Sequence, residues 1–158
     1  MNDYDLVKPL RRILSYGGGV QTFALLLLIQ KGSIPKPSCL IFSDTGCEWP
    51  HTYKHIDEVA KPICLELGIP FITVMHKEGL IPGYSATNSI PMAGFRSCTY
   101  HYKVRPIHKY IKETWPLEKV DGKPSFVSLI GISTDESKRA LPREDQIPLW
   151  MVLEYPLL

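Results

Sequence analysis

Three consecutive glycines flanked by hydroxyl-bearing residues form the segment of this chain with the clearest chemical potential. They follow a short apolar stretch and lead directly into the apolar run at residues 23–29. Glycine lets the backbone turn sharply and lets a ligand approach the peptide groups without meeting a Cβ. The first N–H groups of a helix lack partners within it and lie at its positive end, so such a turn binds anions. We predict a phosphate-binding turn whose ligand contacts come from Ser15, Tyr16, Gly17, Gly18, Gly19, Gln21 and Thr22.

Three kinds of glycine-rich nucleotide loop compete for this segment. A Walker loop requires Lys followed by Ser or Thr after its last glycine, and Val20 and Gln21 exclude it. The Rossmann fingerprint is weakened because Thr22 replaces its third glycine, although Asp44 falls about where its acidic residue belongs. The loop of the ATP pyrophosphatases, usually S-G-G-x-D-S, matches with Gly17, Gln21 and Thr22 as departures. A plain strand-to-helix turn is the remaining alternative.

A second polar cluster follows the apolar stretch at residues 39–42. Asp44 and Thr45 begin it. A carboxylate at a strand end can accept a hydrogen bond from a ribose hydroxyl or an adenine amine, or hold Mg²⁺ through water. The alternative is that Asp44 and Thr45 only shape the turn. We expect both residues to belong to the binding site.

A third segment gathers cations before or at the start of a predicted helix. The positive end of a helix favours anions, so Arg96, Lys103 and Arg105 gathered there indicate a bound anion. Arg96 can bind phosphate or sulfate through two parallel hydrogen bonds, whereas Lys103 acts as a point charge. The alternative is an exposed basic face, which fits Arg105, Lys109 and Lys112. The interleaved tyrosines would also fit a nucleic-acid surface.

A fourth segment, residues 131–140, follows another apolar stretch. Arg139 can reach the terminal phosphate of a nucleotide, with Asp135 or Glu136 orienting it, or the segment is a solvated charged loop. The four cysteines contain no C-x-x-C pair, which speaks against a zinc knuckle and a disulfide framework. Cys39 and Cys64 are predicted to be buried. Cys47 and Cys98 fall in loops near the expected site.

Strands and helices alternate along the chain and position these segments. Nearly continuous apolar strands joined by helices indicate a parallel sheet covered on both faces. Ligands of such sheets bind at the carboxyl ends of the strands, where these polar segments fall. Residues 76–99 are predicted to form a long loop. We predict strands at 12–15, 39–42, 71–74, 125–132 and 149–153, and helices at 20–31, 51–67 with a kink at Pro62, and from Pro106 to about 114.

Length and composition limit the classes of protein that remain. The chain of 158 residues fits one domain, residues 1–158, with 18 Lys and Arg against 16 Asp and Glu. A net charge of +2 does not demand a polyanionic partner. The longest apolar run is too short to span a bilayer and no signal peptide opens the chain, so we expect no membrane partner and a cytoplasmic location.

Together, the four segments resemble the phosphoadenosine phosphosulfate (PAPS) reductase family of the adenine-nucleotide alpha-hydrolase superfamily. The resemblance implies a doubly wound, Rossmann-like α/β fold with a five-stranded parallel sheet of order 3-2-1-4-5. It also implies a bound adenine nucleotide, either ATP or PAPS. The glycine turn would then hold phosphates, Asp44 would lie near the nucleoside, and Arg96, Lys103 and Arg139 would face the sulfate or phosphate. The matching residues are 15–22, Asp44-Thr45-Gly46 with Glu48, Pro50, Thr52 and Tyr53, then Cys98-Thr99 with Lys103 and Pro106, and finally 131–140.

Departures from the family pattern qualify what it implies about chemistry. Reductases of this family attack sulfate with a cysteine thiolate near the C-terminus, but no cysteine follows Cys98. Only Cys98 matches the motifs of the iron–sulfur type, so no cluster is expected. Gln21 in place of aspartate puts metal binding there in doubt, and we expect no protein-bound metal centre. The chain also stops where the family continues, so we expect a minimal relative or a fragment without the C-terminal extension.

The sequence therefore favours an enzyme that acts at an α-phosphate or sulfate. Sulfur transfer, or adenylation of a substrate with release of pyrophosphate, fits best. The turn, with Arg96, Lys103 and Arg139, would stabilise the developing charge. A thiol step would fall to Cys98, to Cys47 or to a sulfur-donor protein, and phosphorothioation of DNA is one version that the resemblance implies.

Two rivals stay open, a non-catalytic nucleotide-binding or regulatory module and a dinucleotide oxidoreductase. If the chain binds an adenine nucleotide, Gly18→Val is expected to fill the space that a phosphate needs.

Overall fold

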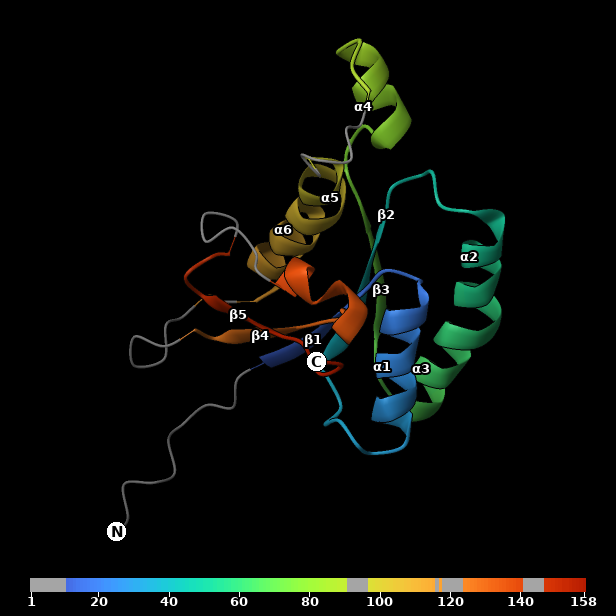
Figure 1. The fold of residues 1–158 in the computed structure, drawn as a ribbon, viewed down its shortest axis with the longest axis vertical. Helices are drawn as coiled ribbons and strands as arrows, with labels where there is room; N and C mark the ends of the chain where they lie inside the picture. The colour runs from blue at the N-terminus through green and yellow to red at the C-terminus, as the bar shows by residue number, and fades with distance from the viewer. Residues whose placement is uncertain (1–10, 91–96, 116, 118–123, 141–146) are drawn as a thin grey trace.

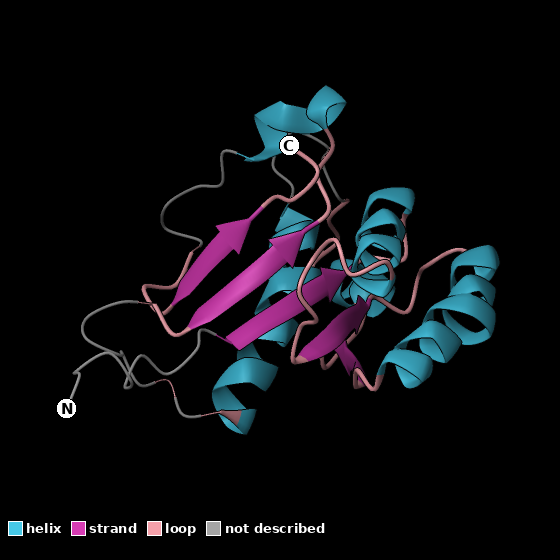
Figure 2. Cartoon of the chain, turned by 90° about the horizontal axis from the view of Figure 1, so that it is seen from below, coloured by secondary structure: helices cyan, strands magenta, loops and turns pink. Residues whose placement is uncertain are grey.

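The five strands form one parallel sheet in the order β3-β2-β1-β4-β5, which confirms the predicted class and strand order (Figure 1). The computed structural model describes residues 11–90, 97–115, 117, 124–140 and 147–158. Figure 2 shows the strands running in the same direction. Their bounds are Arg11–Tyr16 for β1, Cys39–Asp44 for β2, Phe71–Met75 for β3, Phe126–Ile130 for β4 and Met151–Glu154 for β5.

One face of the sheet is covered by α1 (Val20–Gln30) and by a second helical stretch. That stretch comprises α2 (Pro50–His55), the π-helical turn η1 (Ile56–Ala60) and α3 (Lys61–Leu67). Alternate strand residues point to this face, and they include Leu14, Leu40 and Leu129, all fully buried. This packing fixes the start of α1 at the carboxyl end of β1.

The opposite face is covered by α6 (Arg105–Thr114), which continues from α5 (Ser97–Thr99) and the π-helical turn η2 (Tyr100–Val104). Ile107 and Ile111 of α6 pack with Ile13 and Ile41 of the central strands. Figure 1 shows α5 and α6 on the other side of the sheet from α1, α2 and α3. Both faces of the central strands are therefore closed, as their apolar sequences predict.

The helix predicted at 51–67 is broken by a π-helical turn rather than by a simple kink at Pro62. The N–H of Lys61 bonds back five residues to the carbonyl of Ile56. The same arrangement precedes Pro106, where the N–H of Arg105 bonds to the carbonyl of Tyr100. A proline ring clashes with the carbonyl of the preceding α-helical turn, and the wider π turn makes room for it.

The prediction of one long loop over 76–99 is wrong for part of that range. Residues Leu80–Ala86 form α4, and α5 begins at Ser97. The N–H of Leu80 donates to the carbonyl of Thr45, which ties the start of α4 to the end of β2. Pro82 fits the first helical turn, and Tyr84 packs against Tyr102 with ring centroids 5.8 Å apart. These tertiary contacts, which local sequence does not reveal, stabilise a short helix rich in glycine and proline.

Within the part of the chain that the structure describes, no helix has the length and apolar character needed to cross a bilayer.

Candidate functional site

The carboxyl ends of β1, β2 and β4 bring the described sequence segments to one edge of the sheet. The glycine turn (residues 17–19) follows β1, and Gln21 just beyond it donates to Glu136 across 3.2 Å. The end of β2 is tied to η2, because the hydroxyl of Ser43 donates to the carbonyl of Tyr102 at 2.8 Å. Such an edge, beside a reversal of strand order, is where open α/β sheets bind ligands.

The glycine turn is held in shape by the hydroxyl of Thr22. This hydroxyl accepts from the N–H of Gly17 at 3.3 Å and donates to the carbonyl of Gly19 at 3.0 Å. The first helical bond runs from the N–H of Phe23 to the same carbonyl of Gly19. Among the described residues, no side chain caps the start of α1. Its first N–H groups therefore remain available to an anion, which is the electrostatic requirement for a phosphate site.

Gly17 and Gly18 face different surroundings. Beyond its chain neighbours, a Cβ at Gly17 would meet no atom of the described residues within 4 Å, whereas a Cβ at Gly18 would lie 2.6 Å from Cγ2 of Thr52 and 3.5 Å from Cδ1 of Ile56. Gly18 also has a φ of +73°, which side-chain-bearing residues rarely adopt. The expectation that a side chain at Gly18 would fill phosphate space is therefore wrong, because it would meet α2. Gly17 is the position that opens to a ligand.

The backbone after β4 lies directly against the start of α1. A Cβ at Gly131 would stand 2.8 Å from the backbone nitrogen of Thr22, so only glycine fits this contact. The chain then forms the 3₁₀-helix η3 (Thr134–Ala140), which carries Glu136 to Gln21. The sequence placed Gly131 in the segment 131–140 but did not indicate its close contact with Thr22. A glycine directly after an apolar strand was the available signal.

The residues after β2 form a hydrogen-bonded turn. Oδ1 of Asp44 accepts from the N–H of Gly46 at 2.8 Å and from the hydroxyl of Tyr53 at 2.7 Å. Burial, and then the hydrogen bond to Asp44, raises the pKa of Tyr53 above its usual value. Thr45 is buried, and its hydroxyl donates to Glu48 at 3.0 Å. These contacts give Asp44 and Thr45 the turn-shaping role that the sequence left as an alternative.

The ammonium group of Lys103 lies 2.9 Å from Oε1 of Glu48, the oxygen that also accepts from Thr45. The two side chains are only 38% and 16% exposed, so the ion pair is partly shielded from water. An anionic ligand would have to compete with Glu48 for Lys103. Half-buried Cys98 lies five residues earlier in α5. Arg96 lies outside the described residues, and only the backbone of Arg139, in η3, is described.

Ser15 and Tyr16 point to opposite faces of the sheet. Tyr16 is 2% exposed with its ring edge-on to Phe71, and burial, then the proximity of Cys64, raises the pKa of its phenol. Its hydroxyl has no hydrogen-bond partner within the described part of the chain. Neither side chain points into the glycine turn, so a ligand there would meet only their backbone.

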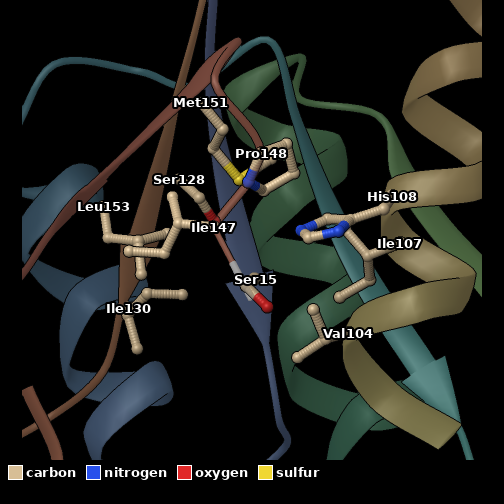
Figure 3. Close-up of a pocket in the computed structure, with 10 residues that line it drawn as sticks. All are labelled: Ser15, Val104, Ile107, His108, Ser128, Ile130, Ile147, Pro148, Met151 and Leu153. Carbon is tan, nitrogen blue, oxygen red and sulfur yellow. The ribbon is translucent and has the colours of Figure 1, made fainter. Parts of the chain in front are cut away.

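Ser15 lines a cavity of about 110 Å³ on the α6 side of the sheet, and the sequence had not indicated this cavity. Figure 3 shows its hydroxyl, the buried hydroxyl of Ser128 and the ring of His108 among apolar side chains. Burial, and then Lys112, lowers the pKa of His108 to about 4, so its imidazole is neutral at pH 7. Serines within otherwise apolar strands were the available signal. The apolar lining comes from Val104, Ile107, Ile130, Ile147, Pro148, Met151 and Leu153.

The cysteines divide into two classes; the burial of Cys39 and Cys64 is as predicted, but Cys98, expected in a loop, lies in the short helix α5. Cys39 and Cys64 are buried, and burial raises their pKa values to about 12 and about 11, so both thiols stay protonated at neutral pH. Cys47 is exposed and Cys98 half-buried, so both can meet a partner. Among the residues with described placement, no three His, Cys, Asp or Glu side chains converge to hold a metal ion.

Two comparisons with known proteins show what the chain is similar to. The family model of the phosphoadenosine phosphosulfate reductase domain matches residues 11–130, from the first residue of β1 to the last of β4. An uncharacterized nin region protein of Escherichia phage lambda is 27% identical over 153 residues, a match that covers 83% of this chain and 51% of the phage protein. The chain thus spans about half the length of that curated relative.

Proposed function

Because the chain belongs to the phosphoadenosine phosphosulfate reductase domain family, we propose that it binds ATP or PAPS at the carboxyl edge of the sheet and acts at the α-phosphate or sulfate. The observation that carries this proposal is the uncapped start of α1 behind a glycine turn that opens to solvent at Gly17. Fixed N–H groups of that kind bind phosphate in many nucleotide sites.

In this proposal the glycine turn holds the phosphates and the β2 end receives the nucleoside. The N–H groups at Gly19, Gln21 and Thr22 would stabilise negative charge as an acceptor attacks the α-phosphorus and pyrophosphate leaves. Lys103 would add a positive charge on leaving Glu48, and Arg96 and Arg139 would extend the same role. Mg²⁺ with the nucleotide would find carboxylates at Asp44 and Glu48.

Sulfur transfer is the second form of the same proposal. A thiolate would attack the sulfur of PAPS, take the sulfonate group and release adenosine bisphosphate. Cys98 and Cys47 are the accessible thiols of the described chain, and a sulfur-donor protein would be the partner in their place.

A non-catalytic nucleotide-binding module is the second candidate. Two observations favour it, since Gln21 and Lys103 are both engaged by carboxylates, those of Glu136 and Glu48. A module that uses these contacts to sense a nucleotide, without breaking it, would need no thiol and no departing pyrophosphate.

Calorimetric titration with ATP and with PAPS, followed by assays for pyrophosphate and sulfite, tests both candidates. The enzyme proposal expects binding of one nucleotide and release of the corresponding product when an acceptor or thiol donor is supplied. Binding with no product under any acceptor or donor supports the sensing module instead. If neither nucleotide binds to the full chain, both candidates are wrong.

A further inference from the structure

An open groove of about 630 Å³ lies between the end of β3 and α6, and no residue of the glycine turn is among the described residues that line it. We call it the α6 groove and define it by His76, Lys77, Tyr100, Arg105, Lys109 and Lys112, which line it. The fold brings these segments together because α6 packs on β2 and β3. None of the described residues proposed to contact the adenine nucleotide lines it, so its role needs a separate explanation.

Positive charge is concentrated in this groove. Among the described residues that line it, four fixed cations face one carboxylate, that of Glu113, whereas the whole chain has 18 Lys and Arg against 16 Asp and Glu. The four cations are all exposed. Lys109 lies 3.8 Å from Glu113, an exposed ion pair of a kind that contributes little. The local field therefore favours an anion much more than the net charge of the chain indicates.

The spacing of the cations selects an extended anion. Arg105, Lys109 and Lys112 occupy positions i, i+4 and i+7 of α6, so they share one face of the helix. With a rise of 1.5 Å per residue, the stripe is about 10 Å long. Each strand of duplex DNA carries one charge per 3.4 Å of helix axis, so a single strand that keeps this stacked spacing places about three successive phosphates along the stripe. A single inorganic phosphate is shorter than this stripe, whereas an extended polyanion spans it.

An aromatic side chain completes the groove. Tyr100 is half-buried on the turn that leads into α6, with its ring 5.5 Å from that of His101. Bases of unpaired strands stack on such rings, and every base has a face that can do so. We propose that the α6 groove binds single-stranded nucleic acid, with phosphates on Arg105, Lys109 and Lys112 and a base on Tyr100. This surface acts whether or not a nucleotide occupies the glycine turn.

The test is fluorescence anisotropy of a labelled oligothymidine over a range of salt concentrations, without any adenine nucleotide. Contacts to three or four phosphates predict a slope of log affinity against log salt between about −2 and −3. Lys109→Glu and Lys112→Glu should each weaken binding roughly tenfold at low salt, and should reduce the slope by about one unit. Tyr100→Ala should weaken binding of oligothymidine but not of inorganic polyphosphate.

Lys54→Glu is the matched control. Lys54 makes the same kind of exposed i,i+4 pair, 3.9 Å from Glu58 with a side chain 68% exposed, compared with 3.8 Å and 75% for Lys109. It lies on α2, which covers the other face of the sheet, so Lys54→Glu should leave affinity and slope unchanged.

Three results would overturn the proposal. They are no binding of oligothymidine at low salt, equal losses in Lys54→Glu and Lys109→Glu, and tighter binding of duplex than of single strand. If Tyr100→Ala binds oligothymidine with unchanged affinity, the proposed stacking of a base on Tyr100 is wrong. Because ATP and PAPS are absent, failure here leaves the nucleotide proposal standing, and failure of nucleotide binding leaves the groove standing.

Discussion

The glycine turn and the α6 groove both favour anions, but they do so with different groups. The turn presents backbone N–H groups at the start of α1, and its shape depends on Gly18 against Thr52 and on the hydroxyl of Thr22. The groove presents side-chain cations on an exposed helix face. A backbone site is fixed in geometry, whereas long basic side chains adjust to their ligand and are screened by salt.

This difference predicts opposite responses to mutation and to salt. One added methyl group should disable the turn, because the backbone cannot move away without disturbing β1 and α1. The groove should tolerate the replacement of any one of its cations by a neutral residue, since the remaining cations still attract the strand. Raising the salt concentration should weaken the groove much more than the turn.

The largest expected effect is on nucleotide affinity at Gly17. Gly17→Ala should weaken binding of ATP or PAPS roughly 50-fold, because the new methyl group enters the open space that the ligand needs. Apart from Gly17 and its two chain neighbours, no atom of the described residues lies within 4 Å of that methyl position, so the melting temperature should not fall. Calorimetry and thermal denaturation of the same preparation measure both quantities.

Gly18→Ala is the adjacent comparison. It should lower the free energy of unfolding by about 1–3 kcal/mol, since a φ of +73° strains any side chain and Cγ2 of Thr52 is already close. Denaturant unfolding measures the loss. If Gly18→Ala unfolds at the same denaturant concentration as the wild type while Gly17→Ala is destabilised, the assignment of the two glycines is reversed.

A smaller effect is expected at His108, which lines both the cavity and the α6 groove. Its pKa is lowered from 6.5 to about 4, so the folded state resists protonation while the unfolded chain takes up a proton. This stability is present above pH 6.5 and should be lost as the pH falls toward 4, by on the order of 3 kcal/mol. His108→Gln should flatten that part of the stability profile. An unchanged profile would mean that His108 titrates normally and adds charge to the groove.

Most of the fold followed from the sequence because its signals are local and periodic. Apolar stretches such as 39–42 are typical of the buried strands of a parallel sheet. The order of the strands was predicted from the family resemblance and is now confirmed. The helix at Leu80–Ala86 was missed because a bond from Leu80 to Thr45 and the packing of Tyr84 on Tyr102 stabilise it from distant parts of the chain. The two π turns were also missed. A proline in the sequence indicates a clash inside an α-helix, but it does not indicate which local structure avoids that clash.

The sequence predicted the segments of the candidate site but not the directions in which their side chains point. It identified the glycine turn as a unit, yet could not show that Gly17 is open while Gly18 is enclosed by a helix more than thirty residues later. Ser15 and Tyr16, expected at the ligand, point to opposite faces of the sheet. The pairing of Lys103 with Glu48 likewise depends on η2 lying beside β2. Such placements are set by packing between distant segments.

Titration of the isotopically labelled protein with ATP and PAPS, followed by amide NMR, tests the central claim most directly. We predict that the N–H signals of Gly17, Gly19 and Gln21 shift on saturation with one nucleotide, while those of Lys109 and Lys112 stay in place. Shifts confined to the α6 groove, with the turn unperturbed, would contradict the account.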